Sequence, residues 1–258
     1  MKDLLKYGSL LILLIFSFYY TDRVSNFIIY KSDLMKQIQR NKNKYEKESI
    51  SAEVFEDYII PGLNGLKINE LDSYYKMKYD YVFSSSKYVY DEVSPNISLE
   101  QNKHLIINRG NKLKKGVSII IQNNKNVKEY IESKNVVANI AINYESFDKN
   151  SELEQINIDK DFKKLDILLD KYKINTNICL VNDDNKDKCI KQGKYLVKPT
   201  YIIDNTSIIG LEITSGDILY IEDDLNLANF KLVLKTISYR NLEIMKLSKL
   251  ISEKKNII

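Results

Sequence analysis

The pattern of apolar and polar positions first separates an apolar N-terminal run from the rest of the chain. Residues 7–20 (YGSLLILLIFSFYY) carry no charge, and Lys2 and Lys6 precede them. Such a run is typical of a membrane anchor, although a cleaved signal peptide or a buried helix has a similar length. Because the run ends in bulky residues (FYYTD) and not in small ones, we expect an uncleaved single-pass anchor over residues 1–22. The positive-inside tendency then predicts an extracytoplasmic location for the remaining chain.

From residue 116 onward, short apolar runs alternate with amphipathic segments. Residues 117–121 read VSIII, an almost continuous apolar run that is typical of a strand covered on both faces. The alternation predicts an α/β domain with a largely parallel sheet, in which helices connect successive strands. The expected strands are 117–121, 136–142, 177–181, 195–203, 210–213 and 217–221, and the expected helices include 127–133, 159–172 and 225–238.

Residues 23–108 predict a charged helix and a small α+β region. The sequence AEVFEDYIIPGLNGLKINEL contains two turn signals, Pro-Gly and Asn-Gly, and Asn69 precedes a helical pattern as a helix cap. The polar and basic stretch NRGNKLKKG then indicates a boundary. We therefore expect an anchor at 1–22, a small α+β region at 23–108 and the main domain at 109–258.

Composition excludes several functional classes. The 258 residues carry 39 basic and 35 acidic side chains, and because these are interspersed they predict no nucleic-acid partner. The single histidine, His104, and the two cysteines, Cys179 and Cys189, exclude zinc sites built on three histidines or four cysteines. We interpret His104 as a surface or packing residue. The two cysteines fit either a disulfide or a pair of reduced buried thiols.

Three blocks of sequence point to a known family. They are IIPG at 59–62 followed by SYYKMK at 73–78, INRGNK at 107–112, and SGDILY at 215–220 followed by LSKLISE at 247–253. On these blocks the chain resembles the polysaccharide deacetylase family (carbohydrate esterase family 4, the NodB-homology domain), and within it a membrane-anchored Gram-positive branch. The resemblance implies a distorted (β/α) barrel, complete or incomplete, and metal-dependent removal of acetyl groups from N-acetylated sugars.

The resemblance also implies where the chemistry should lie, and there the sequence departs from the family. The paired aspartates after the first strand correspond to Gln122 and Asn123, and no His-x-x-x-His follows the second strand. The late Leu-His pair falls at Ile221 and Glu222. Because a metal such as zinc would lose its ligands, activation of water by a metal is not available. We expect a degenerate site with no cofactor and no working deacetylase.

A binding role remains open for the inherited cleft. The family's Arg-Pro-Pro turn corresponds to Lys198-Pro199-Thr200, and Tyr201 and Tyr220 lie at strand positions near the cleft, so Lys198, Tyr201, Tyr220 and Glu222 are candidate ligand-binding residues. We expect a cell-envelope module that binds cell-wall glycan or protein. The alternatives are an active hydrolase with a rearranged site, using Glu222 and Asp217, and a purely structural interaction protein.

Overall fold

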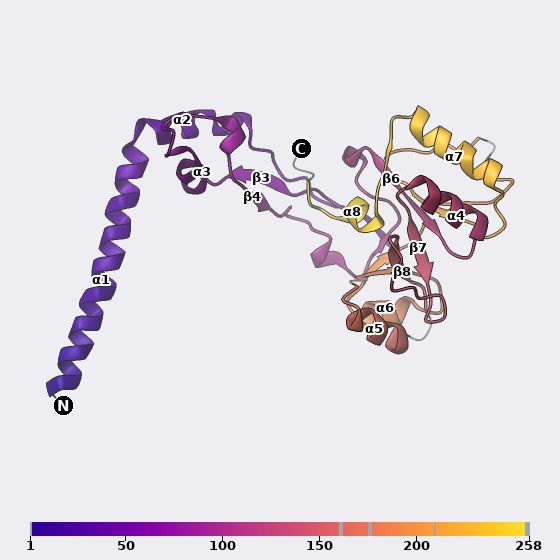
Figure 1. Ribbon diagram of the computed structural model, residues 1–258, viewed down its shortest axis with the longest axis horizontal. Coiled ribbons are helices and arrows are strands. Elements are labelled where there is room, and N and C mark those ends of the chain that lie inside the picture. The colour runs from indigo at the N-terminus through magenta and orange to yellow at the C-terminus, as the bar shows by residue number, and fades with distance from the viewer. Residues whose placement is uncertain (1, 160–161, 175–176, 209, 256–258) are drawn as a thin grey trace. The chain divides into compact units, whose positions relative to one another are not determined.

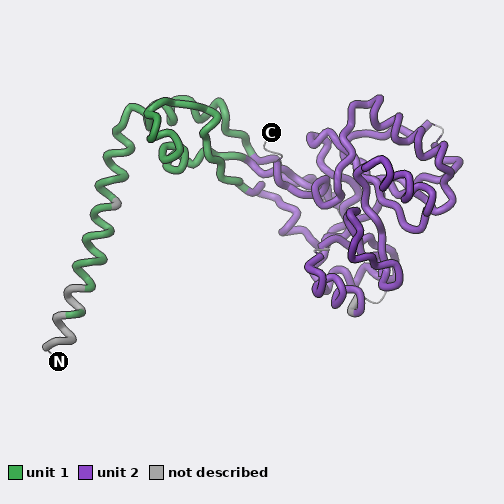
Figure 2. Tube along the Cα trace, viewed as in Figure 1, with its two compact units in different colours: residues 1–48, 66–93 green, residues 49–65, 94–258 purple. Residues whose placement is uncertain are grey.

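The chain forms two compact units (Figure 2). The computed structural model describes residues 2–159, 162–174, 177–208 and 210–255. One unit consists of residues 1–48 and 66–93, and the other of residues 49–65 and 94–258. This division differs from the boundary predicted after residue 108. The reason is that strands from within 49–65 and 94–108 hydrogen-bond to the large sheet of the second unit.

The first unit is mainly helical, with a small two-stranded sheet. Two of its helices begin at a polar residue whose side chain caps the helix. Ser32 accepts a hydrogen bond from the Met35 backbone N–H (3.2 Å), and Asn69 accepts one from Asp72 (3.0 Å), as predicted for Asn69. The elements are α1 (Lys2–Lys31), α2 (Asp33–Asn41), η1 (Lys42–Lys44), β3 (Gly65–Ile68), α3 (Glu70–Met77), η2 (Ser85–Lys87) and β4 (Tyr90–Val93). Their shared core consists of Ile29, Leu34, Met35, Ile38, Ile68, Met77 and Tyr88.

Helix α1 continues past the predicted anchor. Its segment Leu11–Lys31, with 21 residues and a mean hydropathy of 1.2, is long and apolar enough to cross a membrane, and none of its most apolar part is buried. A signal sequence near an N-terminus has the same properties. The side chains of Lys2 and Lys6, on which the predicted orientation depends, lie outside the described part of the chain.

The second unit is built on a curled, mostly parallel sheet of 11 strands, which confirms the predicted α/β class. The sheet forms a half barrel (Figure 1), and no pairing joins its two edge strands within the described residues. Among the described strands of this sheet, β1 and β2 form the one antiparallel pair. In spatial order the strands are β1 (Glu53–Val54), β2 (Tyr58–Ile60), β5 (Ile106–Ile107), β10 (Tyr195–Val197), β9 (Ile178–Leu180), β8 (Glu154–Asn157), β7 (Asn139–Ile142), β6 (Gly116–Ile121), β12 (Ile218–Ile221) and β11 (Tyr201–Ile203), with β13 (Glu243–Ile244) also on β6.

Two details of the sheet differ from the prediction. The single strand expected over 195–203 is two strands, β10 and β11, because the turn at 198–200 contains Pro199. No strand forms at 210–213, whereas β8 arises from a segment that reads EQIN and pairs with β7 over four residues. Its polar residues do not resemble a strand pattern, yet they are buried: Gln155 donates to the Asp148 carbonyl oxygen, and Asn157 accepts from the Asp159 backbone N–H.

Apolar side chains fill both faces of the sheet. The outer face carries α4 (Lys125–Lys134), α5 (Phe162–Lys171) and α7 (Leu227–Tyr239), with Phe230 fully buried. The inner face carries α8 (Leu247–Ile251), which buries Leu247, Leu250 and Ile251. The remaining short helices are η3 (Glu100–Asn102), η4 (Lys112–Lys114) and α6 (Lys186–Lys191).

Lys114 ties η4 to the end of α8, because its ammonium group donates to the carbonyl oxygens of Lys249 and Ser252. Burial, together with the nearby charge of Lys249, lowers the pKa of Lys114 from 10.5 to about 8. Between these two values the unfolded chain binds a proton that the folded chain lacks, so stability should rise with pH across this window.

This pH dependence can be measured by urea unfolding of the full chain at several values from pH 8 to pH 10.5. We expect the free energy of unfolding of the wild type to rise with pH relative to that of Lys114→Met, which has no titrating group at this position. A difference between the two proteins that stays constant over the window would contradict the lowered pKa.

Candidate functional site

The carboxyl ends of β6 and β12 bring the predicted catalytic positions to one edge of the sheet. These strands pair in parallel from Ser118–Ile218 to Ile121–Ile221, so the residues that follow them lie at the same level. Gln122 and Glu222 are the first residues after each strand. In open α/β sheets, ligands bind at this carboxyl edge, and this is the place where the resemblance puts the catalytic site.

Two of the candidate residues contact each other directly. The Tyr220 hydroxyl donates to Gln122 Oε1 at 2.5 Å. Burial raises the pKa of Tyr220 to about 12, and the negative charges of Asp223 and Glu222 add to the shift. Tyr220 therefore stays a neutral hydrogen-bond donor at physiological pH, and the side-chain carbonyl of Gln122 accepts its hydrogen bond.

Asn123 and Asp223, the next residues along the chain, form a second contact at this edge. Asn123 donates to the Asp223 carboxylate twice, from its backbone N–H (2.9 Å) and from Nδ2 (3.2 Å). Buried Asn124 donates to the Glu222 and Leu225 carbonyl oxygens at 3.1 and 2.9 Å and caps α4. The sequence did not predict that Asp223 would bind Asn123. An asparagine directly before an amphipathic helix was the available signal for Asn124.

The side chains at this edge do not fit the divalent metal that the resemblance implies. Zinc in a hydrolytic site needs three protein ligands drawn from His, Cys and carboxylates. Here the amides of Gln122 and Asn123 replace carboxylates, and both Asp223 oxygens accept hydrogen bonds from Asn123. No group of three His, Cys, Asp or Glu side chains placed to hold a metal occurs among the residues that the structure describes.

The prediction that Tyr201 shares a cleft with Tyr220 is wrong. Tyr201 pairs with Leu219 in the sheet, and Tyr220 pairs with Ile202, so the two tyrosines point to opposite faces. Tyr201 packs with the outer core, whereas Tyr220 packs with the inner one. Lys198 is exposed after β10, and within the described residues it forms no hydrogen bond or ion pair with Gln122 or Glu222. Lys198 and Tyr201 therefore do not complete a site with Tyr220.

The rearranged two-carboxylate site is also excluded by the strand order. Asp217 precedes β12 and Glu222 follows it, so five residues at roughly 3.3 Å each separate them by about 16 Å. Asp217 is buried and structural, because Arg109 binds it at 2.7 Å and Thr214 donates to it from its backbone N–H at 2.6 Å. These carboxylates cannot act together on one bond.

The remaining candidates lie away from this edge. His104 is exposed. Cys179 in β9 and Cys189 in α6 form a disulfide, with their Cα atoms 6.2 Å apart. Of the two arrangements that the sequence left open, the structure contains the bridged one.

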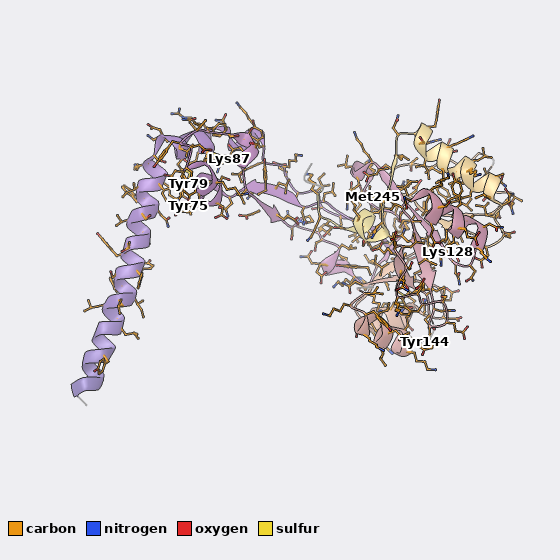
Figure 3. All side chains as sticks on the ribbon, viewed as in Figure 1. Tyr75, Tyr79, Lys87, Lys128, Tyr144 and Met245 are labelled. Carbon is orange, nitrogen blue, oxygen red and sulfur yellow. A yellow bond between two sulfur atoms is a disulfide. The ribbon has the colours of Figure 1, made fainter. Side chains whose placement is uncertain are left out.

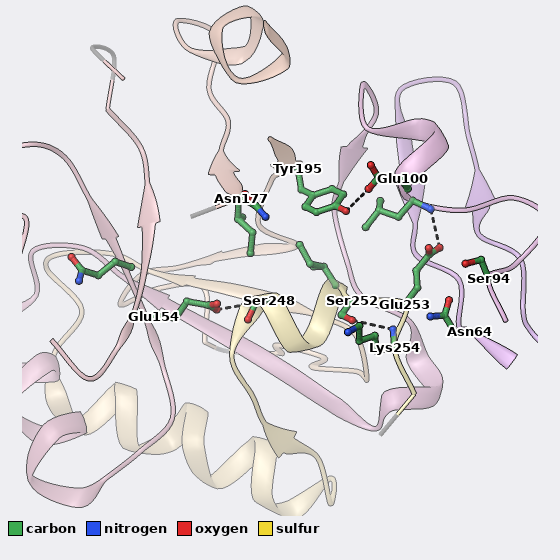
Figure 4. A pocket seen from close by; sticks show the side chains of 14 residues that line it. Asn64, Ser94, Glu100, Glu154, Asn177, Tyr195, Ser248, Ser252, Glu253 and Lys254 are labelled. Atoms are coloured by element: carbon green, nitrogen blue, oxygen red, sulfur yellow. Dashed lines mark hydrogen bonds between the residues drawn. The ribbon is translucent and has the colours of Figure 1, made fainter. Parts of the chain in front are cut away.

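A cavity of about 340 Å³, lined by both polar and apolar groups, opens at the opposite, amino-terminal end of the strands (Figure 4). Glu154 in β8, Asn177 before β9 and Tyr195 in β10 lie in one wall of the cavity. The C-terminal segment after α8 forms the other wall. Its lining residues are Asn64, Ser94, Leu99, Glu100, Glu154, Gln155, Asn177, Ile178, Tyr195, Ser248, Ile251, Ser252, Glu253 and Lys254. The sequence did not indicate this cavity, because its residues come from six separate parts of the chain.

Hydrogen bonds fix the acidic side chains of this cavity. Glu253 Oε1 accepts from the backbone N–H groups of Leu99 (2.8 Å) and Gly62 (3.2 Å), while burial raises the pKa of the Glu253 carboxyl. Glu100 accepts from the Tyr195 hydroxyl at 2.8 Å. Burial and this bond raise the pKa of Tyr195 to about 12. The cavity therefore presents ordered acceptors and a neutral phenol, a set suited to a polar, hydroxyl-rich ligand.

Comparisons with known proteins bear on the fold. No model of a known protein family matches the sequence. Over 92 residues, 35% of this chain, the sequence is 34% identical to the uncharacterized protein YlxY of Bacillus subtilis (strain 168), and the match spans 29% of that relative's length.

Solved structures match over most of the chain. Wild-type BA3943 of Bacillus anthracis, a CE4 family pseudoenzyme, covers 87% of this chain and 97% of its own with a TM-score of 0.54 and 17% identity. A BA3943 mutant with restored enzymatic activity gives a TM-score of 0.55, 17% identity, and coverage of 87% and 100%. The half-barrel fold agrees with the family resemblance seen in the sequence. By its fold, this chain is similar to solved structures of the carbohydrate esterase family 4.

Proposed function

We propose that this chain is a membrane-anchored, extracytoplasmic, non-catalytic protein of the cell envelope that binds glycan. The main support for this proposal is the hydrogen bonding among the side chains at the carboxyl ends of β6 and β12. There, Tyr220 bonds to Gln122 and Asn123 bonds to Asp223, in place of a metal-binding set. Without a bound metal, nothing at this edge lowers the pKa of water enough to make hydroxide at neutral pH. The chain would accordingly work without a metal cofactor.

The proposed location rests on two features. The most apolar part of the segment Leu11–Lys31 is not buried and suits a hydrocarbon environment. The Cys179–Cys189 disulfide in the second unit suits an oxidising compartment outside the cytoplasm. An N-terminal anchor with an external C-terminal unit accounts for both features.

The proposed glycan site is the cavity at the amino ends of the strands. Its volume of about 340 Å³ is in the range of small-molecule sites. Carboxylate, amide and hydroxyl groups line it, and these are the groups that exchange hydrogen bonds with sugar hydroxyls. We favour this cavity over the cleft that the family resemblance implied at the carboxyl edge, because Lys198 and Tyr201 do not join Tyr220 at that edge.

A retention assay on purified peptidoglycan tests glycan binding. We expect the detergent-solubilised full chain to be retained above a heat-denatured control. Ser94→Trp, which places an indole in the cavity, should reduce retention to the level of the denatured control, because the side chain occupies the ligand's volume. Ser133→Trp, at an exposed position on α4, is the matched control and should be retained like the wild type.

Two results would contradict this part of the proposal. Retention of the wild type no greater than that of the denatured chain would favour the purely structural interaction protein. Equal retention of Ser94→Trp and Ser133→Trp would mean that glycan binds elsewhere than in the cavity.

A further inference from the structure

The first unit exposes aromatic side chains directly after α3. Tyr79, Tyr81 and Val82 are 81%, 79% and 63% exposed, and Tyr75 on α3 is 40% exposed. Large apolar groups gathered at one place on a small unit mark a contact surface. Tyrosine combines an apolar ring with a polar hydroxyl, so it suits a boundary that is dry on one side and wet on the other.

The backbone at this place is held in a costly conformation. Tyr81 has φ of 48°, in the left-handed region, which a bulky side chain rarely adopts. A glycine or asparagine would form the same turn at a lower conformational cost. The turn therefore presents an aromatic ring outward at the expense of local stability, and such strain tends to occur at functional surfaces.

The charge of this surface is positive. Lys78 lies over the rings of Tyr75 and Tyr79, with its ammonium nitrogen 4.6 and 5.3 Å from their centroids. Lys76 is exposed beside them, and the one acidic residue of the turn, Asp80, is paired with Lys87. Aromatic rings beside lysines that form no ion pair within the described residues match a lipid headgroup layer that carries anionic phosphates.

The position of this surface next to α1 identifies the occupant. Met77, the last residue of α3, shares a core with Ile29 near the end of α1, so the turn that follows α3 begins beside the end of the apolar helix. Figure 3 shows Tyr75 and Tyr79 on the same side of α2 as α1. On α1 itself, Phe27 and Ile28 are both 64% exposed at this level. A bilayer crossed by Leu11–Lys31 would have its headgroup layer here.

We propose that Tyr75, Tyr79, Tyr81 and Val82, together with Lys76 and Lys78, form a second membrane contact that rests in the headgroup layer of the bilayer crossed by α1. This inference rests on the proposed anchor. The anchor fixes the distance of the first unit from the membrane, and the aromatic surface fixes its tilt. The same chemistry would be found on any anionic leaflet, so the partner is the lipid surface itself and not a particular headgroup.

The absence of tryptophan from the sequence allows a direct test. Three single-tryptophan variants of the full chain are reconstituted into vesicles of phosphatidylcholine and phosphatidylglycerol whose acyl chains carry bromine either near the headgroup or near the bilayer centre. The variants are Phe16→Trp in α1, Tyr79→Trp in the proposed contact and Tyr239→Trp, an exposed position in the second unit. Bromine quenches only an indole within contact distance, so quenching reports depth.

We expect Phe16→Trp to be quenched most by deep bromine, Tyr79→Trp by shallow bromine, and Tyr239→Trp by neither. Quenching of Phe16→Trp without quenching of Tyr79→Trp would overturn the second contact and leave the anchor intact. A blue-shifted Tyr79→Trp emission that bromine does not quench would assign the surface to a protein partner or a second copy, and would also overturn it. Absence of quenching at Phe16→Trp would refute the anchor and the contact together.

Discussion

Replacing Gly216 with alanine is expected to lower the free energy of unfolding of the second unit by about 3 to 5 kcal/mol, as the sum of conformational strain and a backbone clash. Gly216 has φ of +96°, and a Cβ there would lie 2.3 Å from the Gly110 carbonyl oxygen. Neither chain can move away easily, because Gly110 N–H donates to Gly216 O, and Gly216 N–H donates to Gly116 O, both at 2.7 Å. Strands β6 and β12 begin directly after the place where these segments cross.

Gly210→Ala is the matched control for this substitution. Gly210 also has a positive φ, +82°, but an added Cβ would meet nothing within 4 Å. Gly210→Ala should therefore lower the free energy of unfolding only by the conformational cost of the positive φ, about 1 to 2 kcal/mol. Urea unfolding followed by circular dichroism measures both variants. Equal losses for Gly210→Ala and Gly216→Ala would show that the close approach to Gly110 does not limit this crossing.

Replacing Asn139 with alanine should cost about 3 kcal/mol or more, because three buried groups lose their partner at once. Asn139 is fully buried at the start of β7. Its Nδ2 donates to Ser118 Oγ and to the Ile119 carbonyl oxygen, both at 2.7 Å, and its Oδ1 accepts from the Leu247 N–H at 2.8 Å. One side chain therefore joins β6, β7 and the first residue of α8 on the inner face.

An asparagine on the surface of α4 provides the control for Asn139→Ala. Asn126 is exposed within this helix, and alanine there has the better helix propensity. Asn126→Ala should leave stability unchanged or raise it by up to about 0.5 kcal/mol. The two variants are compared by the same urea titration. A loss below about 1 kcal/mol in Asn139→Ala would mean that water replaces the amide, contrary to the buried network described above.

The sequence predicts those parts of the fold that local patterns control. The apolar run of β6 and the cap at Asn69 follow from alternation and side-chain chemistry, and both are present. Strand β8 was not predicted, because Gln155 and Asn157 look like loop residues until their bonding within the fold is known. The participation of β2 and β5 in the large sheet depends on pairing between distant segments, which one sequence does not reveal.

The candidate site was predicted less completely than the fold. The resemblance assigned Gln122 and Glu222 to the degenerate site, and in the structure they follow neighbouring parallel strands. It placed Tyr201 wrongly, because the face of a strand residue depends on register, and a shift of one residue reverses it. The cavity at the amino ends of the strands could not be predicted, since Glu253, Glu100 and Tyr195 are far apart in sequence and meet only in the folded unit.

We propose that this fold keeps a sheet similar to that of carbohydrate esterase family 4 structures, while its carboxyl edge, with Gln122 bound to Tyr220 and Asn123 to Asp223, does not catalyse hydrolysis. Acetate release from N-acetylglucosamine polymers by the full chain, measured with and without added divalent metal ions, tests the claim most directly. We predict release no greater than that of heat-denatured protein under both conditions. Turnover that requires a metal ion and disappears on chelation would contradict the claim.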